Sequence, residues 1–188
     1  MSTPMKKEME SYNYADYCEW DDNGRWELIE GVPYAMAPAP NRRHQEIVGI
    51  LHVELFNFLK GKMCQVFVSP FDVRLNADQE DDTVVQPDLL VICDPEKLDD
   101  KGCKGAPDLI IEILSPATAK YDRLVKFNQY QKARVKEYWM VDPETETVQV
   151  CVLGDRGQYE IFAYGNEDRI PVQVLSGCEI NLQDVFPE

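Results

Sequence analysis

Two acidic residues occupy positions in this chain where carboxylates are unusual. Asp88 lies in an apolar run at residues 86–92, and Glu112 lies inside a second run at residues 107–114. Both runs are rich in Leu, Ile and Val and are bounded by Pro or Gly, which predicts two buried strands. Side chains alternate between the faces of a strand, so Glu112 is expected to share a face with core side chains. Burying an ionised carboxylate is costly without a cation or hydrogen bonds, so Glu112 needs a partner.

The spacing of the acids favours a shared metal ion. Asp88 and Glu112 lie about two dozen residues apart on successive predicted strands, so a sheet can place them side by side. Asp108 is the rival partner, but four residues along one strand separate two backbones by about 13 Å, and it reads instead as a strand-start residue. Two convergent carboxylates with open coordination positions suit Mg²⁺ or Mn²⁺, which keep waters and accept phosphate oxygens. We therefore predict a metal site at Asp88 and Glu112, the alternative being that Asp88 is only the polar start of a strand.

Lys126 is the predicted third member of this site. It lies on a helix expected from about residue 118 to 134, four residues from both Asp122 and Tyr130, along one face. Its ammonium could steady the attacking water or the charge that develops on phosphorus. Two alternatives stay open: ordinary helix-surface pairing of Asp122 with Lys126, and a buried ion pair of Lys126 with Glu112 that needs no metal.

The surrounding segments predict an α/β protein. Asn41 is placed to cap a helix that runs to about Lys60 and stops at Gly61. Strands and helices alternate in the middle of the chain, and strands dominate its end as a C-terminal β-meander. The meander strands are expected at residues 147–153, 159–163 and 172–175. We predict a single domain over residues 1–188 with a mixed central sheet flanked by helices.

Glu30 and His44 are further candidates. Residues 26–32 alternate as a strand does, which predicts that Glu30 is a second acid facing an apolar side. His44 lies near the start of the predicted helix, where a local structural contact is the alternative to a role at the site. His52 is eight residues away, so the two imidazoles diverge by about 80° and are not expected to form a metal pair.

The charge balance restricts how this chain can meet nucleic acid. The formal net charge of -15 over 188 residues argues against broad adhesion, because phosphate binding relies on Lys and Arg. Residues 118–138 hold six bases against two acids, directly after Glu112. Any phosphate-binding groove is therefore expected to be local.

The cysteines and the hydropathy predict a cytoplasmic protein that does not enter the membrane. The six cysteines are scattered without a Cys-x-x-Cys pair or a His cluster, so we predict reduced, mostly buried thiols and no zinc site. No run of about 18 apolar residues occurs, and the first ten residues are polar and charged, which argues against a membrane span and a secretory signal.

The residues singled out above resemble a known family. Pro87-Asp88 followed by Glu112 in a strand resembles the PD-(D/E)XK nuclease superfamily, and the chain is more closely similar to the Uma2 family of restriction-endonuclease-like folds. The matching residues cover most of residues 26–143 in order: Glu27-Leu28-Ile29-Glu30-Gly31, His44, Pro87-Asp88, Pro107-Asp108-Leu109-Ile110-Ile111-Glu112-Ile113-Leu114-Ser115-Pro116, Lys126, and Glu137-Tyr138-Trp139-Met140-Val141-Asp142-Pro143.

This resemblance implies a mixed sheet flanked by helices, metal-dependent phosphodiester chemistry and, often, a homodimer. It also implies Glu30 as an ancillary acid and His44 as a phosphate or water contact. One departure concerns the superfamily lysine, which is expected two residues after the acid, where this chain has Leu114. Lys126 on the following helix fits as its replacement.

Two functional classes follow from these residues. The first is an Mg²⁺- or Mn²⁺-dependent endonuclease that hydrolyses phosphodiester bonds, with DNA favoured over RNA as substrate. The second is a catalytically inactive nuclease-fold domain that binds protein or nucleic acid. The retained acids and lysine favour the enzyme, since a decayed site should lose a buried carboxylate, whereas the net charge of -15 favours the binding module.

Overall fold

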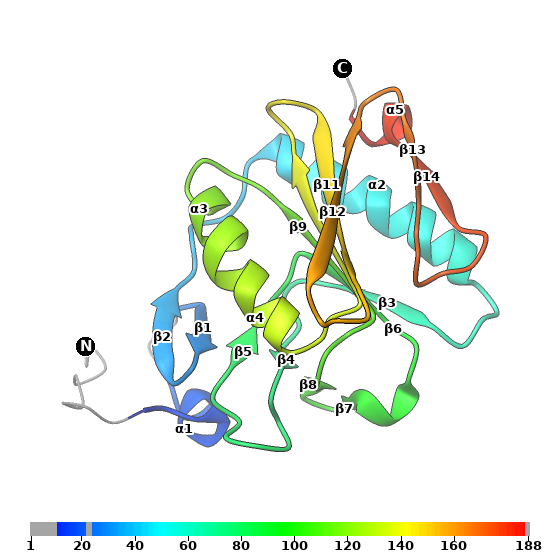
Figure 1. Cartoon of the computed structure of the whole chain (residues 1–188). Helices are drawn as coiled ribbons and strands as arrows, with labels where there is room; N and C mark the ends of the chain where they lie inside the picture. Colours follow the sequence, from blue (N-terminus) through cyan, green and yellow to red (C-terminus); the bar gives the residue numbers. More distant parts are fainter. Residues whose placement is uncertain (1–10, 22–23, 187–188) are drawn as a thin grey trace.

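The computed structural model describes residues 11–21 and 24–186, and it shows a mixed central sheet with helices on both faces (Figure 1). The strands of this sheet are β3 (Gln65–Val68), β6 (Leu89–Ile92), β9 (Leu109–Ile113), β10 (Glu137–Asp142), β11 (Thr147–Leu153) and β12 (Tyr159–Gly165). Their order is β12-β11-β10-β9-β6-β3. β9 and β10 are parallel, and the other neighbours are antiparallel. The predicted α/β fold is confirmed.

The central sheet is covered by one long helix on one face and by a broken helix on the other. The long helix is α2 (Arg42–Leu59), and the broken one consists of α3 (Ala119–Tyr121), the π-helical turn η2 (Asp122–Lys126) and α4 (Phe127–Lys132). Leu109, Ile111 and Ile113 of β9 pack in the core that contains α2. Ile110 lies in the other core, against the broken helix. Because strand neighbours alternate, Glu112 points toward the broken helix, as predicted.

A smaller sheet and a hairpin complete the fold. The smaller sheet has the order β2-β1-β5-β4-β8-β7. Its strands are β1 (Trp26–Ile29), β2 (Val32–Ala35), β4 (Val73–Arg74), β5 (Val84–Val85), β7 (Leu98–Asp99) and β8 (Gly102–Lys104). The remaining elements are α1 (Tyr14–Cys18), η1 (Pro95–Lys97), β13 (Arg169–Pro171), β14 (Glu179–Asn181) and α5 (Leu182–Val185). β13 and β14 form the hairpin, which packs with α5 in the same core as α2.

The start of α2 is fixed by the predicted cap. The Asn41 side chain accepts a hydrogen bond from the His44 backbone N–H at 2.9 Å. This bond satisfies one of the backbone donors that the first helical turn leaves unpaired. The cap also fixes His44 in the first turn of the helix, beside the end of β6.

The strand predicted over residues 26–32 forms only over Trp26–Ile29, and the predicted position of Glu30 on it is wrong. β1 ends at Ile29, and Glu30 and Gly31 form the turn to β2 with φ of 49° and 76°. A Cβ added to Gly31 would lie 2.0 Å from Ser11 Oγ, so this turn requires glycine. Consequently Glu30 is exposed, and the chain continues after the turn as edge strand β2.

Two further expectations about the chain are corrected. Residues 172–175 form a turn rather than a strand, because the chain reverses between β13 and β14. The helix expected from about residue 118 to 134 is broken into α3, η2 and α4, and its buried side carries Asp122, Lys126 and Tyr130. The predicted meander is confirmed for two of its three strands, β11 and β12, and β11 pairs on its other side with β10.

The cysteines differ from the prediction at one pair. Cys64 and Cys93 form a disulfide, whereas Cys103, Cys151 and Cys178 are free and buried, as predicted. The register of β3 and β6 pairs Gln65 with Ile92, so the two bonded cysteines sit opposite each other just beyond these strands. The sequence pattern showed no cysteine pair because the partners are 29 residues apart and meet only in the sheet. Within the described ranges, no helix is both long and apolar enough to cross a membrane.

Candidate active site

The register of two central strands brings the predicted acid pair together. β6 and β9 are antiparallel, with Leu89 opposite Ile111, so Asp88 and Glu112 are the next facing pair. Asp88 Oδ2 accepts a hydrogen bond of 2.9 Å from the Ile113 backbone N–H. The backbone N–H of Asp88 in turn lies 3.5 Å from Glu112 Oε2. Each carboxylate is thus positioned by the backbone beside the other.

Lys126 reaches this pair from the broken helix. Its Nζ lies 2.8 Å from Glu112 Oε1 and 3.7 Å from Asp122 Oδ1. The Tyr130 hydroxyl donates to the same Glu112 oxygen at 2.8 Å. Asp122, Lys126 and Tyr130 therefore share one helix face, as their spacing predicts, and this face points at β9.

Glu27 of β1 is a further member of the cluster, which the sequence analysis missed. Its Oε1 lies 2.9 Å from Lys126 Nζ and accepts a hydrogen bond of 2.9 Å from the Gln86 backbone N–H. The signal that could have found it is the turn at Glu30-Gly31. A strand that ends before this turn has Glu27, not Glu30, as its inward-facing acid.

The cluster carries more negative than positive charge. Glu27, Glu112 and Asp122 surround the single ammonium of Lys126, and Asp88 lies beside Glu112, which leaves three excess negative charges when all are ionised. Burial, reinforced by the neighbouring carboxylates, raises the pKa of Glu112 well above its ordinary value despite Lys126. Burial likewise raises the pKa of Asp122. Such a cluster is stabilised by protons or by an added cation.

Lys126 itself stays protonated. Burial alone would lower the pKa of Lys126, but Glu112, Glu27 and Asp122 outweigh it and hold this pKa well above its ordinary value. The Tyr130 pKa is also raised, by burial and by the charge of Glu112, so its hydroxyl remains a hydrogen-bond donor. Both groups therefore act on Glu112 as fixed donors.

His44 completes the surroundings of Asp88. Its Nε2 lies 3.2 Å from Asp88 Oδ2, and its side chain is 9% exposed. Its Nδ1 is buried and has no hydrogen-bond partner among the described residues. The first turn of α2 thus holds an imidazole against the carboxylate that follows Pro87.

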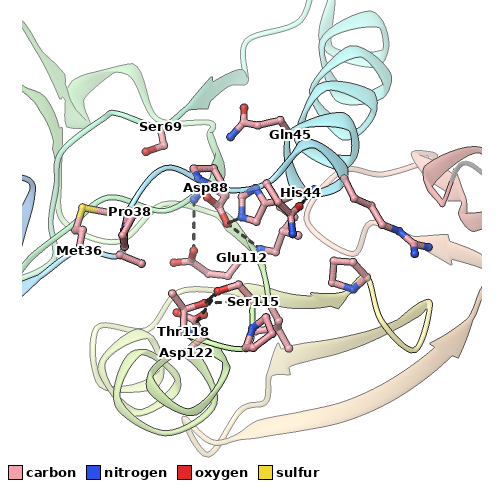
Figure 2. A pocket seen from close by; sticks show the side chains of 18 of the residues that line it. Met36, Pro38, His44, Gln45, Ser69, Asp88, Glu112, Ser115, Thr118 and Asp122 are labelled. Atoms are coloured by element: carbon pink, nitrogen blue, oxygen red, sulfur yellow. Dashed lines mark hydrogen bonds and ion pairs between the residues drawn. The ribbon is translucent and has the colours of Figure 1, made fainter.

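Of these groups, five line a pocket of about 240 Å³: His44, Asp88, Glu112, Asp122 and Lys126 (Figure 2). Figure 2 shows Met36 and Pro38 on one side of Asp88 and Glu112, His44 and Gln45 of α2 on another, and Ser115, Thr118 and Asp122 on a third. Arg25, Arg43 and Lys126 are its basic lining residues. The pocket joins the small sheet, α2 and the broken helix around the ends of β6 and β9.

The donor set fits a hard divalent cation that is only partly coordinated by protein. Among the residues that the structure describes, no three His, Cys, Asp or Glu side chains converge as a metal-binding group. Asp88 Oδ1 accepts no hydrogen bond within the described part of the chain, and Glu112 Oε2 has only the long contact with the Asp88 N–H. Mg²⁺ is commonly held by one or two carboxylates, with water and substrate phosphate completing its shell. The two free carboxylate oxygens and the excess negative charge suit such an ion.

Two of the predicted or weighed residues lie away from this cluster. The Glu30 carboxylate pairs with Lys132 at 2.7 Å on the surface, with side chains 53% and 71% exposed respectively. Asp108 accepts from the Cys93 backbone N–H at 2.7 Å and pairs with Lys136 at 2.6 Å, which agrees with a strand-start role. The structure thus brings together Asp88, Glu112, Lys126 and His44 but not Glu30.

The comparison with known families accounts for nearly the whole chain. A family model named Uma2, described as "Putative restriction endonuclease", matches residues 14–183. This chain belongs to the Uma2 family. The uncharacterized protein slr1290 of Synechocystis sp. (strain ATCC 27184 / PCC 6803 / Kazusa) is 27% identical to it over 163 residues, which are 85% of this chain and 84% of that protein.

One solved structure shares the fold of this chain. It is the crystal structure of "a putative nuclease belonging to DUF820" from Anabaena variabilis, with a TM-score of 0.75 and 20% sequence identity. The similarity covers 93% of the Uma2 chain described above and 97% of the Anabaena chain. Leu114, where the resemblance noted from the sequence predicts a lysine, packs in the core. The ammonium beside Glu112 comes from Lys126 instead.

Proposed function

We propose that this Uma2 protein is a metal-dependent endonuclease that hydrolyses phosphodiester bonds in nucleic acid, with DNA favoured over RNA. The observation that carries the proposal is the convergence of Asp88, Glu112 and Lys126 on the floor of one pocket. Membership of a family described as restriction endonucleases supports it.

The proposed chemistry is hydrolysis. The oxygen of a water molecule forms a bond to phosphorus as the bond from phosphorus to the leaving oxygen breaks, the water loses a proton to solvent, and the leaving oxygen gains one. Lys126 carries its proton at Nζ and acts as a fixed cation near the phosphoryl oxygens rather than as a base. Glu27 and Glu112 hold that ammonium in place, and Tyr130 holds Glu112.

Asp88 and Glu112 are the residues that would hold Mg²⁺ or Mn²⁺. Such an ion supplies Lewis-acid stabilisation of phosphoryl oxygens and a bound, more acidic water. The chain's own contribution is to orient the two carboxylates: Ile113 N–H and His44 Nε2 fix one oxygen of Asp88, and Lys126 and Tyr130 fix one oxygen of Glu112. His44 is therefore proposed as a positioning residue for Asp88.

A second candidate function is an inactive nuclease-fold domain that binds protein or nucleic acid. It is favoured by the ion pairs that Lys126 makes with Glu112 and Glu27, which stabilise the cluster without a metal. The net charge of -15 agrees with it.

The two functions are separated by cleavage assays with purified protein. Plasmid and single-stranded DNA are incubated with Mg²⁺, with Mn²⁺ or with EDTA, using wild type, Lys126→Ala and Lys132→Ala. Metal-dependent cleavage that Lys126→Ala abolishes and Lys132→Ala retains supports the nuclease. Absence of cleavage by folded wild-type protein under all conditions would contradict the nuclease and favour the inactive domain that binds protein or nucleic acid.

Assembly and location belong to the same proposal. We propose a homodimer, because the edge strand β12 of the central sheet carries the exposed side chains Ile161 and Phe162. The single domain over residues 1–188 and the cytoplasmic location stay predictions. The Cys64–Cys93 disulfide argues against the cytoplasmic location, since such bonds are uncommon in a reducing compartment.

A further inference from the structure

We propose that the pocket accepts single-stranded nucleic acid rather than a continuous duplex, with a base stacked on the exposed ring of Tyr34. This inference rests on the proposed nuclease function and names the form of its substrate. Three independent features carry it: the depth of the acid cluster, the charge of the chain, and an aromatic pair beside the pocket.

The reacting groups lie too deep for the phosphates of an undistorted duplex. Glu112, Asp122 and Lys126 are each less than 5% exposed, and the pocket above them holds about 240 Å³. The linker 36–40 and the turn at Pro143 form parts of its wall. A stacked duplex keeps each phosphate on a stiff cylinder, whereas a single strand can bend its backbone and splay its bases into a confined site.

The net negative charge of the chain also favours a single strand over a duplex. A duplex carries one phosphate charge per roughly 1.7 Å of axis, twice the linear density of a single strand in the same geometry. The chain has a net charge of -15, and the pocket has only three basic lining residues, of which Lys126 is already paired with acids. Arg25 is bonded to Ser69 and Gln86. Repulsion therefore weighs more heavily on a duplex than on a single strand.

An aromatic pair beside the cluster offers a stacking surface. Tyr34 on β2 is 38% exposed, and its ring centroid lies 5.3 Å from that of Tyr121. Tyr34 faces Glu27 across the β1–β2 register, and the Tyr121 ring lies 5.7 Å from Lys126 Nζ. Single-strand binding proteins combine a local positive charge with aromatic rings on which bases stack.

The path from this ring to the cluster follows the chain itself. Tyr34 lies on β2 two residues before Met36, which follows the end of the strand and lines the pocket. A nucleic-acid strand with one base stacked on Tyr34 can continue past Met36 and Pro38 to Asp88 and Glu112. Figure 2 shows Met36 and Pro38 beside these two acids.

The first test measures binding without cleavage. One short fluorescent DNA oligonucleotide is titrated with full-length protein, alone or annealed to its complement, by anisotropy with Ca²⁺, which also takes oxygen ligands. We expect tighter binding of the single strand. Tyr34→Ala should weaken that binding roughly fivefold to a hundredfold, the loss of one stacked base, whereas Tyr34→Phe keeps the ring and the affinity. Val32→Ala, an exposed position on the same strand, is the matched control.

The second test separates this inference from the proposed function. The same oligonucleotides are incubated with Mg²⁺ or Mn²⁺ and their products resolved on a gel. Tyr34-dependent binding of the single strand without cleavage would support the substrate form and contradict the nuclease. Duplex that is bound and cut at least as well as the single strand would overturn the inference and leave the nuclease standing. An effect of Tyr34→Ala equal to that of Val32→Ala, or no binding of either form, would also overturn it.

Discussion

Lys126 Nζ lies 2.8 Å from Glu112 Oε1 and 2.9 Å from Glu27 Oε1, so one ammonium joins strands of both sheets to the broken helix. Glu112 belongs to β9 of the central sheet and Glu27 to β1 of the smaller one. The contact is therefore both the centre of the proposed site and a tie between three elements. The contributions of this contact to catalysis and to stability can be measured separately.

Removing the ammonium should destabilise the metal-free protein. Lys126→Ala leaves Glu112 and Glu27 buried without their cation, and we expect it to lower the free energy of unfolding by roughly 3–5 kcal/mol. Lys132→Ala is the matched control on the same helix, because its pair with Glu30 is exposed and should contribute at most about 1 kcal/mol. Urea denaturation in EDTA measures both. Equal losses in the two variants would show that the buried pairs contribute no more than a surface pair.

The same variant should respond to metal more strongly than wild type. With Lys126 removed, the cluster has lost its only ammonium, so Mg²⁺ should raise the Tm of Lys126→Ala by more than it raises that of wild type. Turnover should nevertheless fall by about 100-fold or more, the range for losing one electrostatic stabiliser. If Glu112→Gln rescues the stability of Lys126→Ala and wild type itself cuts no DNA, the lysine is structural.

Metal binding should require both carboxylates of the pair. We expect Glu112→Gln and Asp88→Asn to abolish the Mg²⁺ or Mn²⁺ heat signal in titration calorimetry, because each removes a charged oxygen ligand. Asp108→Asn is the control, since Asp108 is engaged by Lys136 and the Cys93 backbone N–H. Binding in Glu112→Gln equal to that in wild type would remove this residue from the metal site.

The pH dependence of stability should report the burial of Glu112. Burial, with Asp122, Asp88 and Glu27 nearby, holds the pKa of Glu112 well above its ordinary 4.5, despite Lys126. Its stabilising contribution is therefore full below the unfolded pKa and is lost as pH rises through the folded pKa. In EDTA, the Tm of wild type should fall relative to that of Glu112→Gln as the pH rises from the ordinary pKa of 4.5 through the raised pKa of folded Glu112. Parallel curves would contradict the shift.

The sequence was sufficient for the parts of the site that depend on periodicity within one element. Alternation in β9 and four-residue spacing on the helix placed Glu112 and Lys126 correctly, because these periods are properties of the backbone. Glu27 was missed because β1 is buried on both faces, with Leu28 in one apolar cluster and Ile29 in another, which alternation within one strand does not reveal. Cys64 and Cys93 were missed because only the pairing of β3 with β6 brings them together.

The assembly can be tested at two surfaces. Sedimentation at micromolar concentration should show a species of twice 21.6 kDa if the chain pairs through β12. Phe162→Lys, at a 46% exposed position on that edge strand, should then give the monomer. Phe56→Lys, at a 54% exposed position on α2, is the control and would disrupt the dimer only if the helix face were the interface. A single 21.6 kDa species for wild type would remove the proposed dimer.

His44 offers the sharpest test of positioning within the site. Its Nε2 lies 3.2 Å from Asp88 Oδ2, the oxygen that the Ile113 N–H also contacts, so the imidazole orients Asp88 rather than the substrate. Losing such a supporting contact typically lowers metal affinity or activity about 10- to 100-fold. We expect His44→Gln to lower kcat or Mg²⁺ affinity in this range and to leave KM for DNA nearly unchanged. His52→Ala is the control, because His52 lies on the same helix, contacts Phe56 and is not one of the pocket-lining residues. A selective rise in KM for His44→Gln would instead assign the imidazole to phosphate binding, and an unchanged enzyme would make it a local structural contact.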